Sequence, residues 1–165
     1  MGLTVTSVVQ LSVKETSVSE FVSADDPTQT FNGLSTNAEL TSSTTPPVTK
    51  HAVFTKALSG GTGTIDLTSL PDTEGVAAAV TFSGLKIQRA KFTAPTTNAN
   101  DITITLGASN GHPLFTADGI VLSPGQSWTF ENLGVDTGTD VAAGDATWDL
   151  TGTGSQELDV HLVAG

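Results

Sequence analysis

The sequence predicts an all-β protein: an antiparallel β-sandwich, jelly-roll-like, with an extended N-terminal arm. Short segments of alternating apolar and polar residues, such as residues 102–106 and 158–162, are separated by glycine-rich turns. Strands that recur about every eight to twelve residues are typical of a sandwich or barrel. Threonine is abundant and favours a pleated, half-exposed surface, whereas glycine supplies turns. Only residues 75–82, which contain three consecutive alanines, suggest a helical turn.

The chain divides into an N-terminal part, residues 1–49, and a β-sandwich domain, residues 50–165. Residues 3–13 alternate as a strand, and a polar tract follows to residue 49. A loop of that length without structure is unusual inside a compact domain. The tract is therefore either an arm that wraps a surface or a linker from an N-terminal anchor. We favour the arm, whose docking residues would be Phe21, Phe31 and Leu34.

The sandwich domain shows a strand pattern in most of its length. The segments expected to form strands are residues 51–58, 64–67, 85–94, 102–106, 126–131, 141–150 and 158–162, with mixed strand and turn over 114–122. Within residues 85–94 the apolar parity changes, from Leu85 and Ile87 to Ala90 and Phe92. A β-bulge near residues 88–89 would reconcile the two.

The distribution of charge excludes two classes of partner. All six cations lie between Lys14 and Lys91, and the last 74 residues carry nine acids and no cation. Such a half-chain cannot neutralise phosphates, so we expect no nucleic acid, and an anionic membrane surface should repel it. No apolar run has the length of a membrane span, and residues 1–13 lack the pattern of a signal peptide.

No local sequence motif supports a catalytic role. The three histidines, His51, His112 and His161, fall on different segments, and there is no metalloprotease or nucleophile-elbow pattern. Cysteine is absent, which removes thiol nucleophiles and cysteine-ligated zinc. We therefore expect a protein that is not an enzyme, with no catalytic residues and no cofactor.

Two groups of residues, three aspartates and two tryptophans, could bind a ligand, and each can also be explained without one. Asp136, Asp140 and Asp145 could offer oxygen ligands to calcium, but their spacing is not that of an EF-hand. We interpret them as solvated turn residues and expect no metal. Trp128 and Trp148 could form a glycan platform or a protein hot spot if exposed together. We expect both in the core, because the chain has few other large side chains.

Lys86, Arg89 and Lys91 form the only local group of cations. In a chain of net charge −11 they are best interpreted as counter-charges. They would pair with the chain's own acids or with the acidic half of a neighbouring copy, where opposite potentials meet. These three residues are candidates for a subunit or shell interface.

Three C-terminal segments carry a resemblance to a known class of proteins. They are Leu122-Ser123-Pro124-Gly125-Gln126-Ser127, Leu150-Thr151-Gly152-Thr153-Gly154-Ser155-Gln156 and Val160-His161-Leu162-Val163-Ala164-Gly165. In composition, over roughly residues 85–165, the chain resembles small structural proteins of tailed bacteriophages. These proteins often have Thr/Ser/Gly-rich sandwich or jelly-roll modules.

The resemblance implies a virion component, assembled in the host cytoplasm, most simply a capsid decoration (cement) protein that stabilises the shell. Its partners would be the major capsid protein or other virion proteins, and it would be a homotrimer. A second interpretation, of a different class, is a carbohydrate- or receptor-binding sandwich of tail or fibre type. Exposure of Trp128 and Trp148 would separate the two interpretations.

Overall fold

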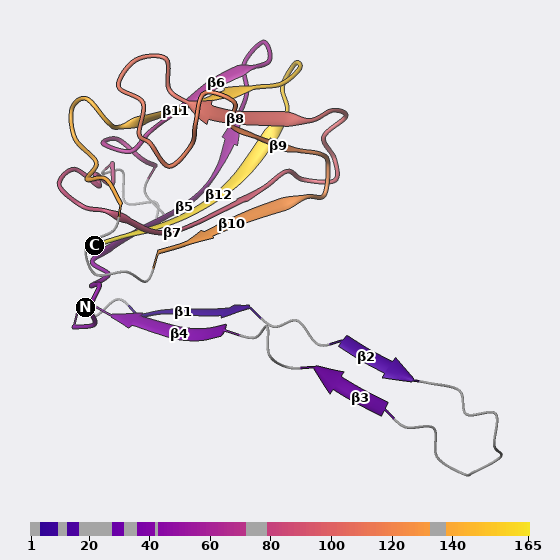
Figure 1. Cartoon of the computed structure of the whole chain (residues 1–165). Coiled ribbons are helices and arrows are strands. Elements are labelled where there is room, and N and C mark those ends of the chain that lie inside the picture. Colours follow the sequence, from indigo (N-terminus) through magenta and orange to yellow (C-terminus); the bar gives the residue numbers. More distant parts are fainter. Residues whose placement is uncertain are drawn as a thin grey trace.

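A computed structural model describes residues 4–9, 13–16, 28–31, 36–41, 43–71, 79–132 and 138–165. Within these residues the regular structure is entirely β, and no helix occurs. Two four-stranded antiparallel sheets face one another and enclose the core (Figure 1). The predicted all-β sandwich is therefore confirmed. Of the proposed helical turn at residues 75–82, residues 75–78 lie outside the described residues, and residues 79–82 are not helical, since Val80 forms a β-bridge with Leu70.

Each sheet combines strands from distant parts of the chain. The lower sheet in Figure 1 has the order β10 (Ser127–Glu131), β7 (Ile87–Thr93), β12 (Glu157–Ala164) and β5 (Lys50–Ala57). The upper sheet has the order β6 (Thr62–Asp66), β11 (Thr147–Thr151), β8 (Ile102–Leu106) and β9 (Ile120–Leu122).

The strand pairs of the sandwich are nested. The first strand pairs with the last, β5 with β12, and the second with the last but one, β6 with β11. In the same way β7 pairs with β10 and β8 with β9. All four pairs are antiparallel, so the chain runs out along four strands and returns along the other four.

The core lies between the sheets because each strand turns its apolar parity inward. The last strand shows this most clearly, since Leu158, Val160 and Leu162 are fully buried while His161 is exposed, as the sequence predicted. Trp148, on β11, is also fully buried, in agreement with its predicted place in the core. The other large, fully buried side chains of this core include Ile65, Leu67, Leu70, Phe82, Phe92, Ile102, Ile104 and Leu150.

The predicted β-bulge is present. Along β12, Val163 pairs with Arg89 of β7, but the next residue, Ala164, pairs with Ile87. Gln88 is therefore the extra residue that the partner strand does not match. The bulge lets Ile87 and Ala90 both point into the core, which the change of parity in the sequence required.

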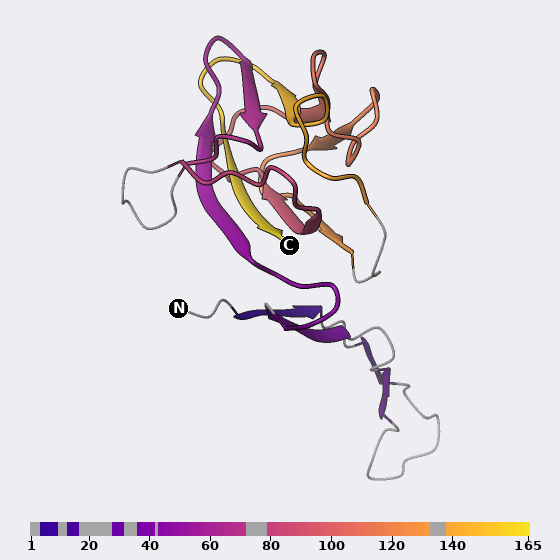
Figure 2. The same ribbon diagram turned by 90° about the vertical axis from the view of Figure 1, so that its left-hand side faces the viewer.

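The N-terminal part contains more regular structure than an extended arm would. Strand β1 (Thr4–Val9) pairs antiparallel with β4 (Thr36–Thr41), and β2 (Val13–Thr16) pairs with β3 (Thr28–Phe31). We call these two pairs the ribbon. Figures 1 and 2 both show it outside the two layers of the sandwich, and its strands belong to neither four-stranded sheet. The described part of the polar tract is thus a chain that folds back on itself.

A tight turn, which we call the elbow (residue 41 and residues 43–49), connects the ribbon to the sandwich. Thr44 Oγ1 accepts a hydrogen bond from Thr41 N at 2.9 Å and lies 2.9 Å from both Thr41 O and Pro46 O. Val48 is fully buried, and its N–H donates to Thr41 O at 2.9 Å. Thr49 N–H then donates to Ala164 O at the end of β12. The described residues of this threonine- and proline-rich segment are therefore hydrogen-bonded to one another and to the end of β12.

Candidate functional site

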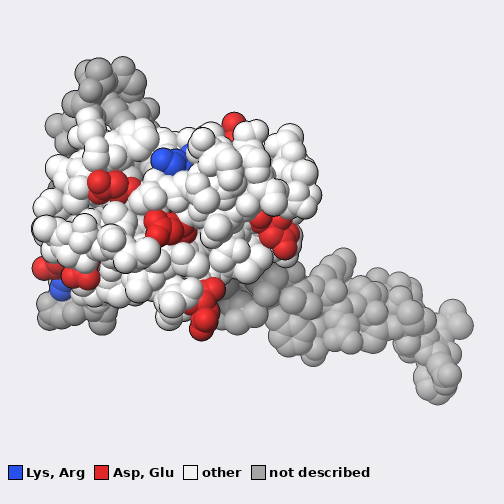
Figure 3. All heavy atoms as spheres, turned by 90° about the horizontal axis from the view of Figure 1, so that it is seen from above, with Lys and Arg blue, Asp and Glu red and all other residues white. Residues whose placement is uncertain are grey.

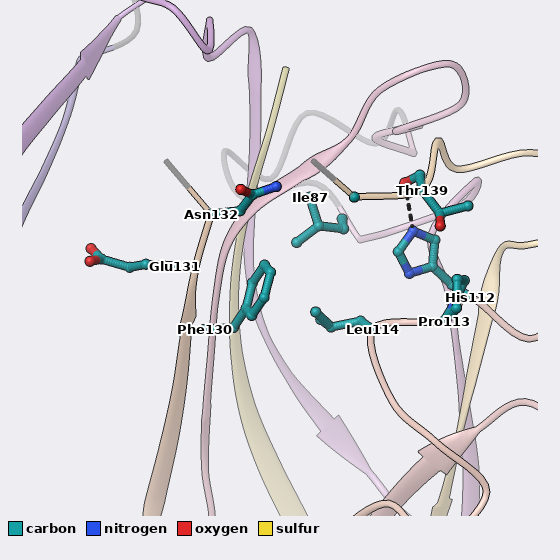
Figure 4. Close-up of a pocket in the computed structure, with 9 residues that line it drawn as sticks. Ile87, His112, Pro113, Leu114, Phe130, Glu131, Asn132 and Thr139 are labelled. Carbon is teal, nitrogen blue, oxygen red and sulfur yellow. Dashed lines mark hydrogen bonds between the residues drawn. The ribbon is translucent and has the colours of Figure 1, made fainter. Parts of the chain in front are cut away.

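A cavity of about 350 Å³ opens at one margin of the sandwich. Its walls come from the start of β7, the segment after β8, the end of β10 and residues 138–139. Figure 4 shows Ile87, Leu114 and Phe130 on one side of this space, with His112 and Thr139 on the other. The remaining lining residues are Pro113, Glu131, Asn132 and Gly138.

His112 is the buried titratable group in the cavity wall, with 3% of its surface exposed. Its Nε2 lies 3.1 Å from Thr139 O, and because a carbonyl can only accept, Nε2 carries the proton. In the neutral ring Nδ1 is then an acceptor, and it has no hydrogen-bond partner among the described residues. Burial lowers the pKa of His112, although its hydrogen bond to Thr139 and the charge of Asp145 act in the opposite direction.

The backbone around His112 holds the ring in place. Trp148 Nε1 donates to His112 O at 3.1 Å, and His112 N donates to Thr147 O at 3.0 Å. The rings of His112 and Trp148 meet edge to face, with centroids 5.8 Å apart. The ring is thus fixed from strand β11 even though it belongs to a connecting segment. His112 therefore takes part in the packing around β11.

An ion pair lies next to the cavity. Arg89 and Glu131 are cross-strand neighbours on β7 and β10, with Nε and Oε1 3.1 Å apart. Their side chains are only 8% and 18% exposed. Burial lowers the pKa of Arg89, and Glu131 acts against that shift. The guanidinium stays charged at any physiological pH. Arg89 therefore pairs with an acid of its own chain, which is one of the two roles considered for the cation group.

The three members of that group have different environments. Arg89 is buried, Lys86 is half-buried and Lys91 is exposed. Lys86 also pairs through its backbone with Gly165 and, as a bridge, with Asp140. Only Lys91 presents a fully exposed cation, so the structure does not bring the three charges together as one surface.

Aromatic side chains converge behind the cavity. Phe92 contacts Phe115, Trp128 and Trp148, with centroid distances of 5.5, 6.0 and 5.6 Å. Trp128 and Phe130 stack at 6.2 Å with an angle of 14° between their planes. Trp128 is half-buried, so its predicted place in the core is only partly realised. Phe130 extends this cluster to the cavity wall.

The other candidate residues do not converge. Asp140 is exposed and Asp145 is half-buried, while Asp136 lies outside the described residues. Among the described residues no group of three metal-ligating side chains is found. His51 and His161 lie on the adjacent strands β5 and β12, whereas His112 belongs to the segment after β8.

Of the expected docking residues, Phe31 is the last residue of β3, where its backbone pairs with Val13. Phe21 and Leu34 lie outside the described residues. Whether these three bind a neighbour stays a prediction.

Sequence reasoning did not find the cavity. Its polar wall residues, His112 and Asn132, stand in connecting segments, where no periodicity indicates which side chain is buried. In the sequence, the adjacency of His112 and Pro113 indicates a turn but does not indicate that the histidine is buried. The burial of Asn132 depends on the end of β10, where its N–H donates to Gln88 O at the bulge.

No protein-family model matches this chain, and neither a curated protein nor a solved structure matches it. In the part of the chain that the structure describes, no helix has the length and hydrophobicity needed to cross a membrane.

Proposed function

We propose that this chain is a non-enzymatic virion structural protein, a capsid decoration protein that binds and stabilises the shell of a tailed bacteriophage. The observation that carries the proposal is the ribbon. Its strands pair with each other and join neither sheet of the sandwich. A two-stranded sheet is marginally stable on its own in water and needs a surface to pack against. A self-paired ribbon attached to an independent sandwich therefore suits docking on another protein.

The connection supports the same role. The elbow hydrogen-bonds to the end of β12 and so gives the ribbon a defined departure point from the sandwich. A flexible linker would lose that orientation and add entropy to be removed on binding. An ordered elbow reduces this cost.

The nested strand pairs support a jelly roll as the finer description of the sandwich. Eight strands whose pairs run first with last, second with seventh, third with sixth and fourth with fifth have the order of two Greek keys wrapped together. Jelly rolls are common in capsid proteins, which is an analogy of fold and not of site.

The charge of residues 1–49 indicates what kind of surface would bind the ribbon. Residues 1–49 carry one cation, Lys14, and five acids: Glu15, Glu20, Asp25, Asp26 and Glu39. Figure 3 shows acidic side chains in several separate groups on the upper face of the sandwich and few cations. Opposite potentials favour association, so the receiving surface should be basic. We place that surface on the major capsid protein or another virion protein, with the chain acting as a homotrimer.

The test measures both mass and binding. Multi-angle light scattering should give three times the chain mass of 16.8 kDa. Sedimentation with shells of the parent virus that lack this protein should show saturable binding, weaker at high salt. Deleting residues 2–38, which keeps Leu40 and the elbow, should abolish binding while the sandwich stays folded. Val121→Ala, at an exposed position of β9, serves as a surface control. A monomer that does not sediment with shells would contradict the proposal.

A further inference from the structure

We propose that the cavity beside His112 is a binding site for a neutral sugar ring. The site is separate from the ribbon, so it adds a second activity to the docking role and does not depend on it. Three properties of the wall lead to this class of ligand: an apolar face with an aromatic ring, buried polar side chains, and the lack of a cation among the described lining residues.

The apolar face is formed by Ile87, Pro113, Leu114 and Phe130. Phe130 is held in position by its stack on Trp128, which in turn contacts Phe92 and Phe115 of the core. A ring fixed in this way provides a flat apolar surface without loss of side-chain entropy on binding. Such a surface suits the C–H face of a pyranose.

Polar groups lie on both sides of the space: Figure 4 shows His112 and Thr139 across from Phe130, and Asn132 on the same side as Phe130. Thr139 is exposed, whereas His112 and Asn132 are more than nine-tenths buried. The unpartnered Nδ1 of His112 is unusual, because buried polar groups in native proteins nearly always have a hydrogen-bond partner. An unmet acceptor in the wall of a cavity indicates that the filled state supplies the missing donor. A sugar hydroxyl is such a donor, and water is the competing one.

The charge of the wall selects among sugars. No lysine or arginine lines the cavity among the described residues, and Glu131 is its one charged lining residue. Figure 4 shows the Glu131 carboxylate pointing away from the space, and it pairs with Arg89. With no cation to balance an anion, the site should favour neutral sugars over sialic acids or sugar phosphates. The volume of about 350 Å³ lies at the lower end of small-molecule sites, which fits one or two rings.

The indole N–H signals of the two tryptophans can report sugar binding directly. The full chain labelled with ¹⁵N should show two indole N–H signals, of which that of Trp128 lies next to the stacked Phe130. Glucose, galactose, mannose and N-acetylglucosamine are titrated separately, with N-acetylneuraminate as the charged comparison. We expect at least one neutral sugar to shift the Trp128 indole signal saturably at millimolar concentration.

Two variants localise the binding. Phe130→Leu removes the aromatic face, and Thr139→Val, at an exposed position, removes a hydroxyl with little risk to folding. We expect each to weaken binding about tenfold, whereas Val121→Ala, on the outer surface of β9, should leave it unchanged.

Three results would overturn the proposal. The first is no saturable shift with any of the four neutral sugars, which is the outcome if the cavity holds water only. The second is equal binding of N-acetylneuraminate. The third is affinity that both variants leave intact.

Discussion

The sandwich and the ribbon are built from the same kind of antiparallel strand pair, yet they differ in how those pairs are combined into sheets. In the sandwich, every strand turns one face toward a second sheet, and the buried side chains form one continuous core. In the ribbon, the described strands form two separate two-stranded sheets. Backbone pairing alone contributes little net stability, because water competes for the same hydrogen bonds. From this difference we expect the sandwich to be stable through its own core and the ribbon to add little to that stability.

The largest expected contrast comes from the core. Phe92 is fully buried and contacts three other aromatic rings. Phe92→Ala should lower the free energy of unfolding by about 3–5 kcal/mol, through lost burial and a residual cavity. Deletion of residues 2–38 should change that free energy by less than about 1 kcal/mol. Urea denaturation followed by tryptophan fluorescence measures both. A deletion as damaging as Phe92→Ala would mean that the ribbon belongs to the core.

A somewhat smaller difference in stability is expected between variants of two cations on one strand of the sandwich, Arg89 and Lys91. Arg89→Met leaves Glu131 in a largely buried place without its partner, so stability should fall by about 3 kcal/mol. Lys91→Met, two residues further and exposed, should stay within about 0.5 kcal/mol. The double variant Arg89→Met/Glu131→Leu should recover part of the loss, because it removes both buried charges. Equal effects of the two single variants in thermal unfolding would refute this view of Arg89.

The smallest effect concerns pH and acts on the sandwich, which contains all three histidines. Burial depresses the pKa of His112 below its ordinary value of 6.5. The unfolded chain therefore binds a proton before the folded chain does, and stability falls as pH drops from 6.5 toward the folded pKa. Asp145, the charged group that acts on this ring, moderates the fall. His112→Gln should remove this part of the pH dependence, and His161→Gln, at an exposed position, should not. An identical slope in all three proteins would exclude His112 as its source.

Most strands of the sandwich could be predicted from the sequence, although β11 begins at Thr147 and not at residue 141 as expected. The alternation in residues 102–106 and 158–162 placed β8 and β12, and the change of parity placed the bulge at Gln88. These features depend on neighbouring residues, since a strand with one buried face needs a period of two and a parity change needs an extra residue. The burial of Trp148 followed from the scarcity of other large side chains.

Which strands meet, and which polar groups become buried, depends on how distant parts of the chain pack together. Ile104 and Leu150 pair although 46 residues separate them, and β5 pairs with β12 across most of the sandwich. Arg89 and Glu131 stand opposite each other because β7 and β10 pair, which turned an expected surface cation into half of a buried ion pair. The cavity likewise requires the end of β10, the segment after β8 and residues 138–139 to come together. Pairing between distant strands depends on the summed burial of the whole core, which no local pattern in the sequence records.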